Sequence, residues 1–371
     1  MKIAMLTKHF TLRNGSSRAI HEVALRLSAR GHDVHIFCNS SPERYAAGPV
    51  LRYVPMLPLG SWGRVLSFDW GCRRKMGAER FDIVHGHGNT TEQDVVTVHI
   101  CRNANRLARG LPLLRRDPHL FIERRQFENR RLRRIIVFSE RLKRDLHRLY
   151  GIPPERVATI PNGVDANRFH PRLRPIHRDR LRREIGLSDG DLAVMFVASG
   201  NFENRGLPNL LSAVARRTNE RVKLIIVGGD RPGPHRAQSR RLGIDDQVVF
   251  LPFTDRLEEL HACADALVFP SYYDTFGSVP LEAMASGLPV VVTASCGMSE
   301  LITDGVDGLI LKDPTDVEAL DSALMRLSDD NLRERLGSKA RETAERQSWD
   351  TVADRTIKLY EELRSGKRDE R

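Results

Sequence analysis

Short runs of apolar, mostly β-branched residues alternate along the chain with longer stretches whose apolar residues recur every three or four positions. The first pair is typical: "KIAMLT" predicts a strand, and "SRAIHEVALRLSARG" predicts an amphipathic helix that ends at Gly31. Further strands are predicted at "DVHIFCN", "FDIVHGH", "DVVTVHI", "RRIIVFS" and "VATIPN". Strands that are apolar on both faces are covered on both faces, so this order predicts a parallel sheet between layers of helices.

A polar stretch rich in Pro, Asn and Arg interrupts the pattern at residues 161–180 and predicts a linker. Beyond it, a second series of strands is predicted at "DLAVMFVAS", "VKLIIVGG", "QVVFLPF", "ALVFPS", "PVVVT" and "GLILK". The stretch from Trp349 to Arg364 predicts a last helix, followed by a disordered, charged end. A chain of 371 residues is also long for one core. We therefore predict an α/β protein of two doubly wound domains, with ligands bound in a cleft between the carboxyl ends of their strands.

Cysteine content and hydropathy narrow the class of protein. The five cysteines are scattered and never form a Cys-x-x-Cys pair, which argues against a disulfide framework or a zinc site and suits a reducing cytoplasm. No apolar run approaches the roughly 20 residues that a membrane-spanning helix needs. The first residues predict a strand rather than a signal peptide. We expect a cytoplasmic protein.

The formal net charge of +11 is concentrated in one segment. Residues 102–148 contain 15 Lys and Arg against 5 Asp and Glu. Such a patch favours an anionic partner: a phosphorylated glycolipid, a membrane surface or a nucleic acid. The alternative is a pair of solvated helical faces with no partner. A nucleic acid is the weakest of these hypotheses, because the segment has few aromatic residues for stacking and no DNA- or RNA-binding motif.

One loop carries the strongest candidate chemistry. In "FPSYYDTFGSVPLEAMASGLPVVVT", residues 269–293, a strand leads through a polar loop into a helix that begins near Pro280. Gly277 allows a ligand close to the backbone, and the first helical turn offers amides and a positive dipole end to a diphosphate. Asp274 and Glu282 can accept hydrogen bonds from sugar and ribose hydroxyls on either side of it. From the residues alone, a ligand-binding loop and an ordinary strand-loop-helix crossover are equally supported.

The same stretch resembles the nucleotide-sugar motif of the retaining glycosyltransferases of family 4. That motif has two acidic residues eight positions apart with Phe-Gly between them, followed by Leu-Glu-Ala-Met-Ala-Ser-Gly-x-Pro-Val-Val. The resemblance extends over nearly the whole chain, through "RGHDVHIF", "FDIVHGHG" and "IPNGVDANRFHP". Within the family, the lipopolysaccharide-core glucosyltransferases are most similar, on "TEQDVVTVHICRNANR", "FIERRQFENRRLRR" and "TASCGMSELI".

The resemblance implies the GT-B fold, in which two Rossmann-like domains face a central cleft. Residues 1–166 are expected to bind the acceptor and residues 167–345 the nucleotide sugar, with the helix of residues 346–371 packed back on the N-terminal domain. The implied reaction moves a hexose, glucose, from a UDP-sugar to a glycan or glycolipid acceptor, in lipopolysaccharide or other cell-surface polysaccharide synthesis. The anomeric configuration is retained, and the implied reaction needs no metal and no cofactor.

Roles for individual residues follow from the same resemblance. Three residues are assigned to catalysis: His99 contacts the donor sugar, Asp274 orients it, and Arg205 neutralises the diphosphate. His99 also has a purely structural interpretation, because it ends a strand. Glu282 is expected to hold the ribose. The other expected donor-binding residues are Gly15, Arg168, Phe253, Thr254, Phe276, Gly277, Ser278 and Val279.

Three positions depart from the family's pattern. Asp274 stands where Glu is usual and is one methylene shorter, so its contacts with sugar hydroxyls must differ or include a water. Asn14-Gly15 replaces two glycines in the N-terminal loop. Arg205-Gly206 replaces a Lys-Gly pair, and its guanidinium can still neutralise a diphosphate. These departures keep a non-catalytic or regulatory GT-B scaffold as an alternative function.

Other motifs in the sequence do not indicate a metal site or a different class of enzyme. His85 and His87 form a His-x-His pair without a third spaced ligand, so we expect them to line the cleft rather than to bind a metal. "SDGD", residues 188–191, is formally an Asp-x-Asp motif, but its place in a polar stretch before a strand predicts a turn. The sequence has no Gly-x-Gly-x-x-Gly and no P-loop, which disfavours dinucleotide oxidoreduction and NTP hydrolysis.

The basic segment gains a role if the acceptor is anchored in lipid. Its Leu120, Phe121 and Phe127 lie among arginines, as they would on a surface that meets lipid phosphates and acyl chains together. We therefore expect peripheral binding to the inner face of an anionic membrane through Arg102–Arg148. The leading contributors are expected to be Arg115, Arg116, Arg124 and Arg125.

Overall fold

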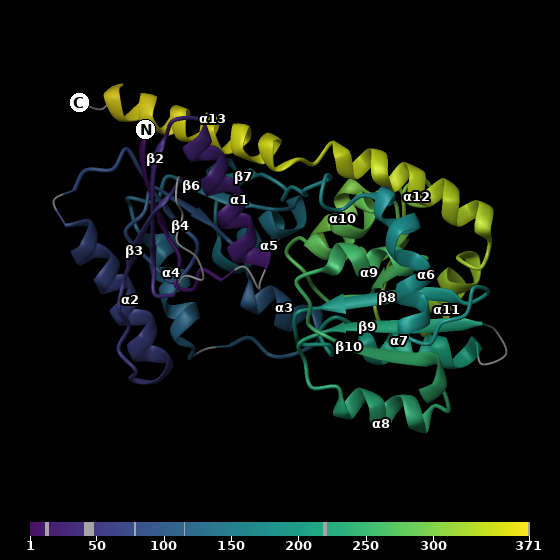
Figure 1. The fold of residues 1–371 in the computed structure, drawn as a ribbon. Helices are drawn as coiled ribbons and strands as arrows, with labels where there is room; N and C mark the ends of the chain where they lie inside the picture. Colours follow the sequence, from purple (N-terminus) through teal and green to yellow (C-terminus); the bar gives the residue numbers. More distant parts are fainter. Residues whose placement is uncertain (12–14, 41–47, 78, 115, 218–220, 370–371) are drawn as a thin grey trace. The chain divides into compact units, whose positions relative to one another are not determined.

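The computed structural model describes residues 1–11, 15–40, 48–77, 79–114, 116–217 and 221–369. The chain divides into two compact units (Figure 1). The first contains Met1–Gly163 together with Trp349–Arg371, and the second contains Val164–Ser348. Each unit is a parallel sheet with helices packed on it, so the prediction of an α/β protein is confirmed.

The first unit has a seven-stranded sheet in the order β3-β2-β1-β4-β5-β6-β7. Its apolar strands are covered on both faces: Ile3 and Met5 of β1 share a core cluster with α1 and α13, whereas Ala4 and Leu6 share one with α2. The strands are β1 (Lys2–Leu6), β2 (Asp33–Cys38), β3 (Val50–Tyr53), β4 (Ile83–Gly86), β5 (Val95–Thr97), β6 (Arg134–Val137) and β7 (Val157–Thr159). The helices are α1 (Gly15–Ala29), α2 (Gly60–Met76), α3 (Arg102–Ala108), α4 (Pro118–Glu128), α5 (Glu140–Tyr150) and α13 (Trp349–Asp369), with a 3-10 turn at Pro154–Arg156.

The last helix, α13, belongs to the first unit although it follows the whole second unit in sequence. Trp349, Val352 and Tyr360 are buried in the core of the first unit. The hydroxyl of Tyr360 lies 2.5 Å from Nδ1 of His85, at the end of β4. The helix extends to Asp369, beyond the Arg364 at which the sequence predicts its end.

The second unit has a six-stranded sheet in the order β10-β9-β8-β11-β12-β13. One large apolar cluster fills it, with Val194 and Phe196 of the central strand β8 packed against α7 and α11. The strands are β8 (Leu192–Ala198), β9 (Val222–Gly228), β10 (Val248–Pro252), β11 (Ala266–Phe269), β12 (Val290–Thr293) and β13 (Leu309–Leu311). The helices are α6 (Arg174–Glu184), α7 (Leu207–Val214), α8 (Gly233–Arg241), α9 (Leu257–Cys263), α10 (Ser278–Ala285), α11 (Val317–Arg326) and α12 (Asp330–Glu345), with 3-10 turns at Pro171–Leu173, Ala215–Arg217, Asp245–Gln247 and Gly297–Leu301.

The linker predicted at residues 161–180 is wrong for its second half, where α6 begins at Arg174. The helix is held by charge rather than by apolar periodicity. Arg174, Arg178 and Arg182 recur every four residues, and all three bond the buried carboxylate of Asp265, at 2.8, 2.7 and 3.1 Å. Three arginines at this spacing lie on one face of a helix, a pattern that a search for apolar positions overlooks.

The basic segment forms α3, α4, β6 and α5, and its charge is partly neutralised within the first unit. Arg148 pairs with Asp145 at 3.0 Å, and Arg131 with Asp94 at 3.6 Å. The prediction that Leu120 and Phe127 touch lipid is wrong, because both side chains are buried in the unit. Of the four leading arginines, Arg115 lies outside the described residues, whereas Arg116, Arg124 and Arg125 are exposed. Within the described part of the chain, no helix combines the length and apolar character that crossing a bilayer requires.

Candidate functional site

The loop between β11 and α10 is held against the segment that follows β12. The amide of Gly297 donates to the carbonyl of Asp274 at 3.0 Å, and the amide of Met298 donates to that of Phe276 at 2.6 Å. Gly277 caps α10 with a φ of 91°, in the left-handed region. A Cβ at Gly277 would lie 2.5 Å from Sγ of Cys296. The close approach of the two segments therefore requires glycine here.

We predict that Gly277→Ala destabilises the second unit. The added methyl has no room beside Cys296, and alanine resists a positive φ; each effect costs about 1–3 kcal/mol. Chemical denaturation would measure the loss. Gly233→Ala, in α8, is the matched control, since nothing lies within 4 Å of a Cβ built there. Equal stability of the two variants would contradict the packing described for Gly277.

Asp274 and Arg205, which the sequence assigns to different parts of the ligand, form an ion pair. Arg205 precedes α7, and the same nitrogen, Nη1, donates to Oγ of Ser271 at 3.2 Å and to the carbonyl of Tyr273 at 3.1 Å. Asp274 also accepts a hydrogen bond from the amide of Phe276, with Oδ1 at 3.0 Å. The pair thus joins the loop after β8 to the loop after β11.

These two loops flank the point where the order of strands reverses in the second sheet. Strands β8 and β11 are neighbours, and the chain runs outwards from β8 on one side and from β11 on the other. Gly206 brings the loops into contact, because a Cβ there would lie 2.0 Å from the carbonyl oxygen of Pro270. In open α/β sheets, ligands bind outside the carboxyl ends of the strands at this switch point. The Arg205–Asp274 pair occupies that position.

Glu282 is buried within α10, with 6% of its surface exposed. Its negative charge acts on Arg168, which binds Glu258 directly at 2.8 Å. Burial lowers the pKa of Arg168, but the bond to Glu258 and the charges of Glu258 and Glu282 outweigh it and raise the pKa overall. Arg168 is therefore held in an acidic setting rather than left as the solvated linker residue that its sequence position suggests.

The remaining expected donor-binding residues of the second unit differ in exposure. Ser278 and Val279, in the first turn of α10, are half-buried. The Phe276 side chain is buried in the unit, so only its backbone is open to a binding role. Phe253 is exposed, and Oγ1 of Thr254 accepts a hydrogen bond from the amide of Arg256 at 3.0 Å.

In the first unit, Gly15 begins α1 and so lies at the positive end of that helix. Its neighbour Asn14 lies outside the described residues. The third residue of the helix, Ser17, is buried and donates from Oγ to the carbonyl of His9 at 3.0 Å. This bond ties the start of α1 to the loop that follows β1.

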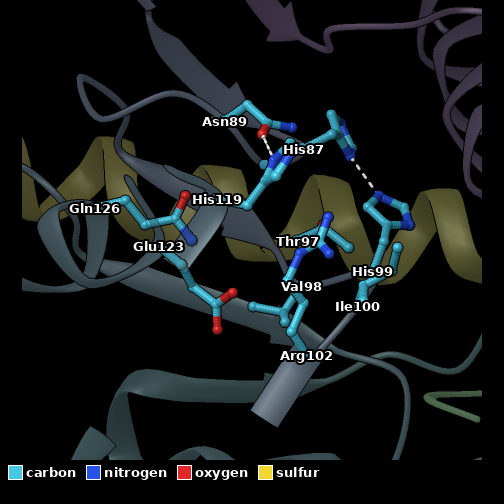
Figure 2. A pocket seen from close by; sticks show the side chains of 11 residues that line it. His87, Asn89, Thr97, Val98, His99, Ile100, Arg102, His119, Glu123 and Gln126 are labelled. Carbon is cyan, nitrogen blue, oxygen red and sulfur yellow. Dashed lines mark hydrogen bonds between the residues drawn. The ribbon is translucent and has the colours of Figure 1, made fainter. Parts of the chain in front are cut away.

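His99 lines a cavity of about 110 Å³ at the carboxyl ends of β4 and β5 (Figure 2). Its Nε2 lies 3.0 Å from Nδ1 of His87, and its ring packs on Phe138 with 5.3 Å between centroids. Burial lowers the pKa of His99 to about 4. Above that pH the imidazole is neutral, so it can exchange hydrogen bonds with a sugar hydroxyl without carrying charge. The cavity is lined by His87, Gly88, Asn89, Thr97, Val98, His99, Ile100, Arg102, His119, Glu123 and Gln126.

The histidines of "HGH" divide between core and cavity. His85 is buried between Tyr360 and Thr97, with Nε2 2.8 Å from Oγ1 of Thr97, so it is a structural residue. His87 lines this cavity of the first unit, whereas the prediction that His85 lines the cleft is wrong, because its side chain is buried. Among the described residues, no group of three His, Cys, Asp or Glu side chains gathers as a metal ion would require. The turn predicted for residues 188–191 is confirmed, because the amide of Ser188 donates to Asp191 at 2.6 Å and that of Asp191 to the Ser188 carbonyl at 3.1 Å.

Sequence reasoning missed most of the polar residues that line this cavity, among them Arg102, His119 and Glu123. One signal was present. Glu123 is three residues after Leu120 and four before Phe127, so it lies on the buried face of α4 among apolar side chains. Burying a carboxylate among apolar side chains costs free energy unless the group is paired or hydrogen-bonded. An acid at this position of the helix therefore points to a polar site. His119 is oriented by Asn89, whose Oδ1 lies 2.7 Å from Nδ1 (Figure 2).

Comparison with known proteins identifies the class. Residues 177–343 match the family model for glycosyl transferases group 1, and residues 13–168 match the model for glycosyltransferase family 4. The structure aligns with that of WaaG, a glycosyltransferase involved in lipopolysaccharide biosynthesis, with a TM-score of 0.84 and 24% identity over 96% of this chain and 99% of that one. The two parallel sheets and the structural likeness to WaaG define the GT-B fold, and the family model defines a glycosyltransferase. The chain belongs to glycosyltransferase family 4, and the resemblance read from the sequence is confirmed.

Relatives match along most of their length. The lipopolysaccharide glucosyltransferase WaaG of Escherichia coli (strain K12) is 26% identical, over 95% of this chain and 96% of that protein. An uncharacterized glycosyltransferase of Methanocaldococcus jannaschii, MJ1607, is 28% identical over 97% of this chain and 98% of that one. The structure of Anabaena Alr3699/HepE in complex with UDP-glucose aligns with a TM-score of 0.78 and 19% identity, over 98% of this chain and 100% of that one.

Proposed function

We propose that this chain transfers glucose from UDP-glucose to a hydroxyl of a glycan or glycolipid acceptor in cell-surface polysaccharide synthesis, with retention of configuration and without a metal ion. The observation that carries the proposal is the Arg205–Asp274 ion pair at the switch point of the second sheet, beside the start of α10. The glucosyltransferase relative WaaG and the UDP-glucose complex of HepE support the choice of donor.

In this proposal the second unit, residues 164–348, binds the donor. Arg205 and the amides at the start of α10 stabilise the negative charge that develops on the leaving diphosphate. Asp274 orients the hexose, and Glu282 accepts hydrogen bonds from the ribose. The backbone of Phe253 and Thr254 is assigned to the base.

The first unit supplies the acceptor site, together with His99 for the donor sugar and Gly15 for the diphosphate. Retention follows if the acceptor attacks on the face from which the diphosphate leaves. The diphosphate then takes the acceptor's proton while the glycosidic bond to UDP breaks and the new one forms. The protein needs no nucleophilic carboxylate for this route, and its contribution is electrostatic.

Labelled UDP-glucose, UDP-GlcNAc and GDP-mannose test the proposal. We expect UDP-glucose to raise the melting temperature most, since a ligand that binds only the folded state stabilises it. We also expect UDP to be released slowly even without an acceptor, equally in EDTA. Binding without any release or transfer would favour the non-catalytic scaffold. No stabilisation by any of the three would contradict a nucleotide-sugar function.

A glycolipid acceptor would require the enzyme to work at a membrane, and the structure offers a surface on α2 and α4. Trp62, Leu66 and Trp70 recur every four residues on α2, with 46%, 44% and 61% of their surface exposed. Phe121 of α4 is 44% exposed and packs on Trp62 with 5.7 Å between ring centroids. Exposed large apolar side chains in such a group mark an interaction surface.

Basic residues border this apolar group. Arg74 lies over the ring of Trp70, 5.4 Å from its centroid. Lys75 follows it on α2, and Arg124 and Arg125 are exposed on α4. Apolar groups that enter the acyl boundary, bordered by cations that meet lipid phosphates, suit the surface of an anionic membrane. We propose peripheral binding to the inner membrane face through this α2–α4 surface.

We predict that Trp62→Ser/Trp70→Ser weakens co-sedimentation with phosphatidylglycerol vesicles about 10-fold or more, because burying a large apolar side chain is worth about 1.5–3 kcal/mol. The matched control is Ile176→Ser/Met325→Ser, two apolar residues of the second unit with 64% and 55% of their surface exposed. Equal losses in both double variants, or no vesicle binding by the unchanged protein at low salt, would exclude the α2–α4 surface and favour a soluble acceptor.

A further inference from the structure

His87 and His99 are in contact in the wall of the cavity of Figure 2. Nδ1 of His87 lies 3.0 Å from Nε2 of His99, and the centroids of the two rings are 5.3 Å apart. His99 lies just beyond β5 and is assigned to the donor sugar, whereas His87 follows β4 and has no role in the proposed function. The contact therefore joins a residue without an assigned role to one that is expected to touch the substrate.

The ring of His87 is held by its own neighbours. It stacks on the ring of His85, with 4.2 Å between the centroids. His85 is fixed in turn, because its Nδ1 lies 2.5 Å from the hydroxyl of Tyr360 and its Nε2 lies 2.8 Å from Oγ1 of Thr97. Tyr360 and His85 are both buried in the first unit. His87 is therefore a well-anchored partner that can set the orientation of the His99 ring.

Both rings of the contact are uncharged near neutral pH. Burial lowers the pKa of His99 to about 4 and lowers that of His87 well below its ordinary value. A neutral imidazole has one N–H and one bare nitrogen, so the bond between the rings contains one hydrogen, either on Nδ1 of His87 or on Nε2 of His99. Each ring has a single hydrogen to place, so the choice decides the tautomer of both residues.

The other nitrogen of His87 favours one of these two arrangements. Nε2 of His87 is buried and has no hydrogen-bond partner among the described residues. If His99 donated to His87, this nitrogen would carry a buried hydrogen without an acceptor, and such N–H groups are rarer in proteins than bare acceptors. If His87 donates from Nδ1, the same nitrogen is a bare lone pair. The geometry therefore favours His87 as the donor and Nε2 of His99 as the acceptor.

We infer that His87 is a positioning residue, which holds His99 in the tautomer that has its hydrogen on Nδ1. The hydrogen bond that one ring nitrogen makes decides which nitrogen carries the hydrogen. Under the proposed function, this Nδ1–H is the group that His99 donates to an oxygen of the hexose. The kinetic consequence therefore rests on the proposed function, whereas the tautomer itself does not.

His87→Phe and His87→Asn separate this role from packing. Phe keeps an aromatic ring on His85 but has no nitrogen, so we expect the turnover of UDP-glucose to fall about 10-fold or more. Asn is smaller, but its amide nitrogen lies near the position of Nδ1 and can donate to His99, so most of the turnover should remain. The affinity for UDP, which lacks the hexose, should be unchanged in both variants.

A role in packing alone predicts the reverse order of the two variants. Phe fills the space of the imidazole ring, whereas Asn leaves part of it empty, and an unfilled space in a packed region lowers stability. Turnover of UDP-glucose by His87→Phe that equals or exceeds the turnover by His87→Asn would overturn the inference.

NMR reads the tautomer directly in the full chain labelled with nitrogen-15 in its histidines. A ring nitrogen that carries a hydrogen differs in chemical shift from a bare one, and the His99 signals are identified by their loss in His99→Gln. We expect the hydrogen of His99 on Nδ1 in the unchanged protein and in His87→Asn, and at least partly on Nε2 in His87→Phe. A hydrogen on Nε2 in the unchanged protein, or an unchanged tautomer in His87→Phe, contradicts the role of His87.

Tyr360→Phe is the matched control for a structural effect. It removes the hydroxyl bonded to His85 and leaves the bond between His87 and His99 in place. We expect lower stability with an unchanged His99 tautomer, and a tautomer change as large as that in His87→Phe would refute the direct role of His87. The tautomer is measured without substrate, so a protein with the expected tautomer and no turnover of UDP-glucose would refute the proposed function alone. The unchanged protein gives its own answer even if His87→Phe does not fold.

Discussion

Replacing Asp274 by Asn is expected to lower hexose transfer by about 100-fold or more in kcat while the affinity for UDP stays unchanged or rises. Asp274 is assigned to the sugar, so UDP alone does not report its loss. Its carboxylate also neutralises Arg205. Asn removes that negative charge, and the guanidinium is then more available to the diphosphate. Transfer kinetics and UDP calorimetry on the same variant measure the two effects.

Asn tests the assignment better than Ala, because Asp274 also makes a hydrogen bond that holds the loop. Its Oδ1 accepts from the amide of Phe276 at 3.0 Å, and the amide oxygen of Asn can keep this bond whereas Ala cannot. Asp274→Ala is therefore expected to lose stability as well as transfer. If Asp274→Asn loses UDP affinity as strongly as it loses transfer, the residue serves the loop rather than the sugar.

Glu282→Ala is expected to weaken UDP binding by about 10- to 150-fold, the loss of about 1.5–3 kcal/mol that charge-assisted hydrogen bonds to the ribose would contribute. The fold should survive, because Arg168 keeps its direct partner Glu258 at 2.8 Å. Isothermal calorimetry with UDP measures the change.

The matched control is Glu259→Gln on α9. Like Glu282, Glu259 is an acid on a helix of the second unit, but it pairs with the exposed Arg256. UDP affinity should be unchanged in this variant. Unchanged UDP affinity in Glu282→Ala would reject the assignment of Glu282 to the ribose. The effect of the Glu282 charge on Arg168 would then be the role that the structure supports.

The order of elements and the family were readable from the sequence because both depend on local pattern. Apolar runs such as "KIAML" and "LAVMFVA" became central strands of the two sheets, buried on both faces. The acidic motif was equally local: Gly277, Phe276 and Cys296 close the loop through contacts between neighbouring strand ends. The start of α6 was missed because three arginines facing Asp265, rather than apolar positions, hold that helix.

Pairings between distant residues required the tertiary structure. Nothing in the local pattern says that the Arg205 guanidinium binds Asp274, because this depends on β8 and β11 being neighbours in the sheet. The surface predicted on the basic segment likewise depended on which side chains α4 buries. Its Leu120 and Phe127 face the core, and the exposed apolar group lies largely on α2 instead.

The sequence by itself determined the strands other than the partly exposed edge strand β3, the helices with apolar periodicity and the residues of the donor motif, since each follows from interactions among residues close along the chain. Only the tertiary structure decided which charges compensate one another. Asp274 is paired with Arg205, and Arg174, Arg178 and Arg182 all bind the buried carboxylate of Asp265. Coulomb interactions depend on distance in space, and the fold sets that distance independently of separation along the chain.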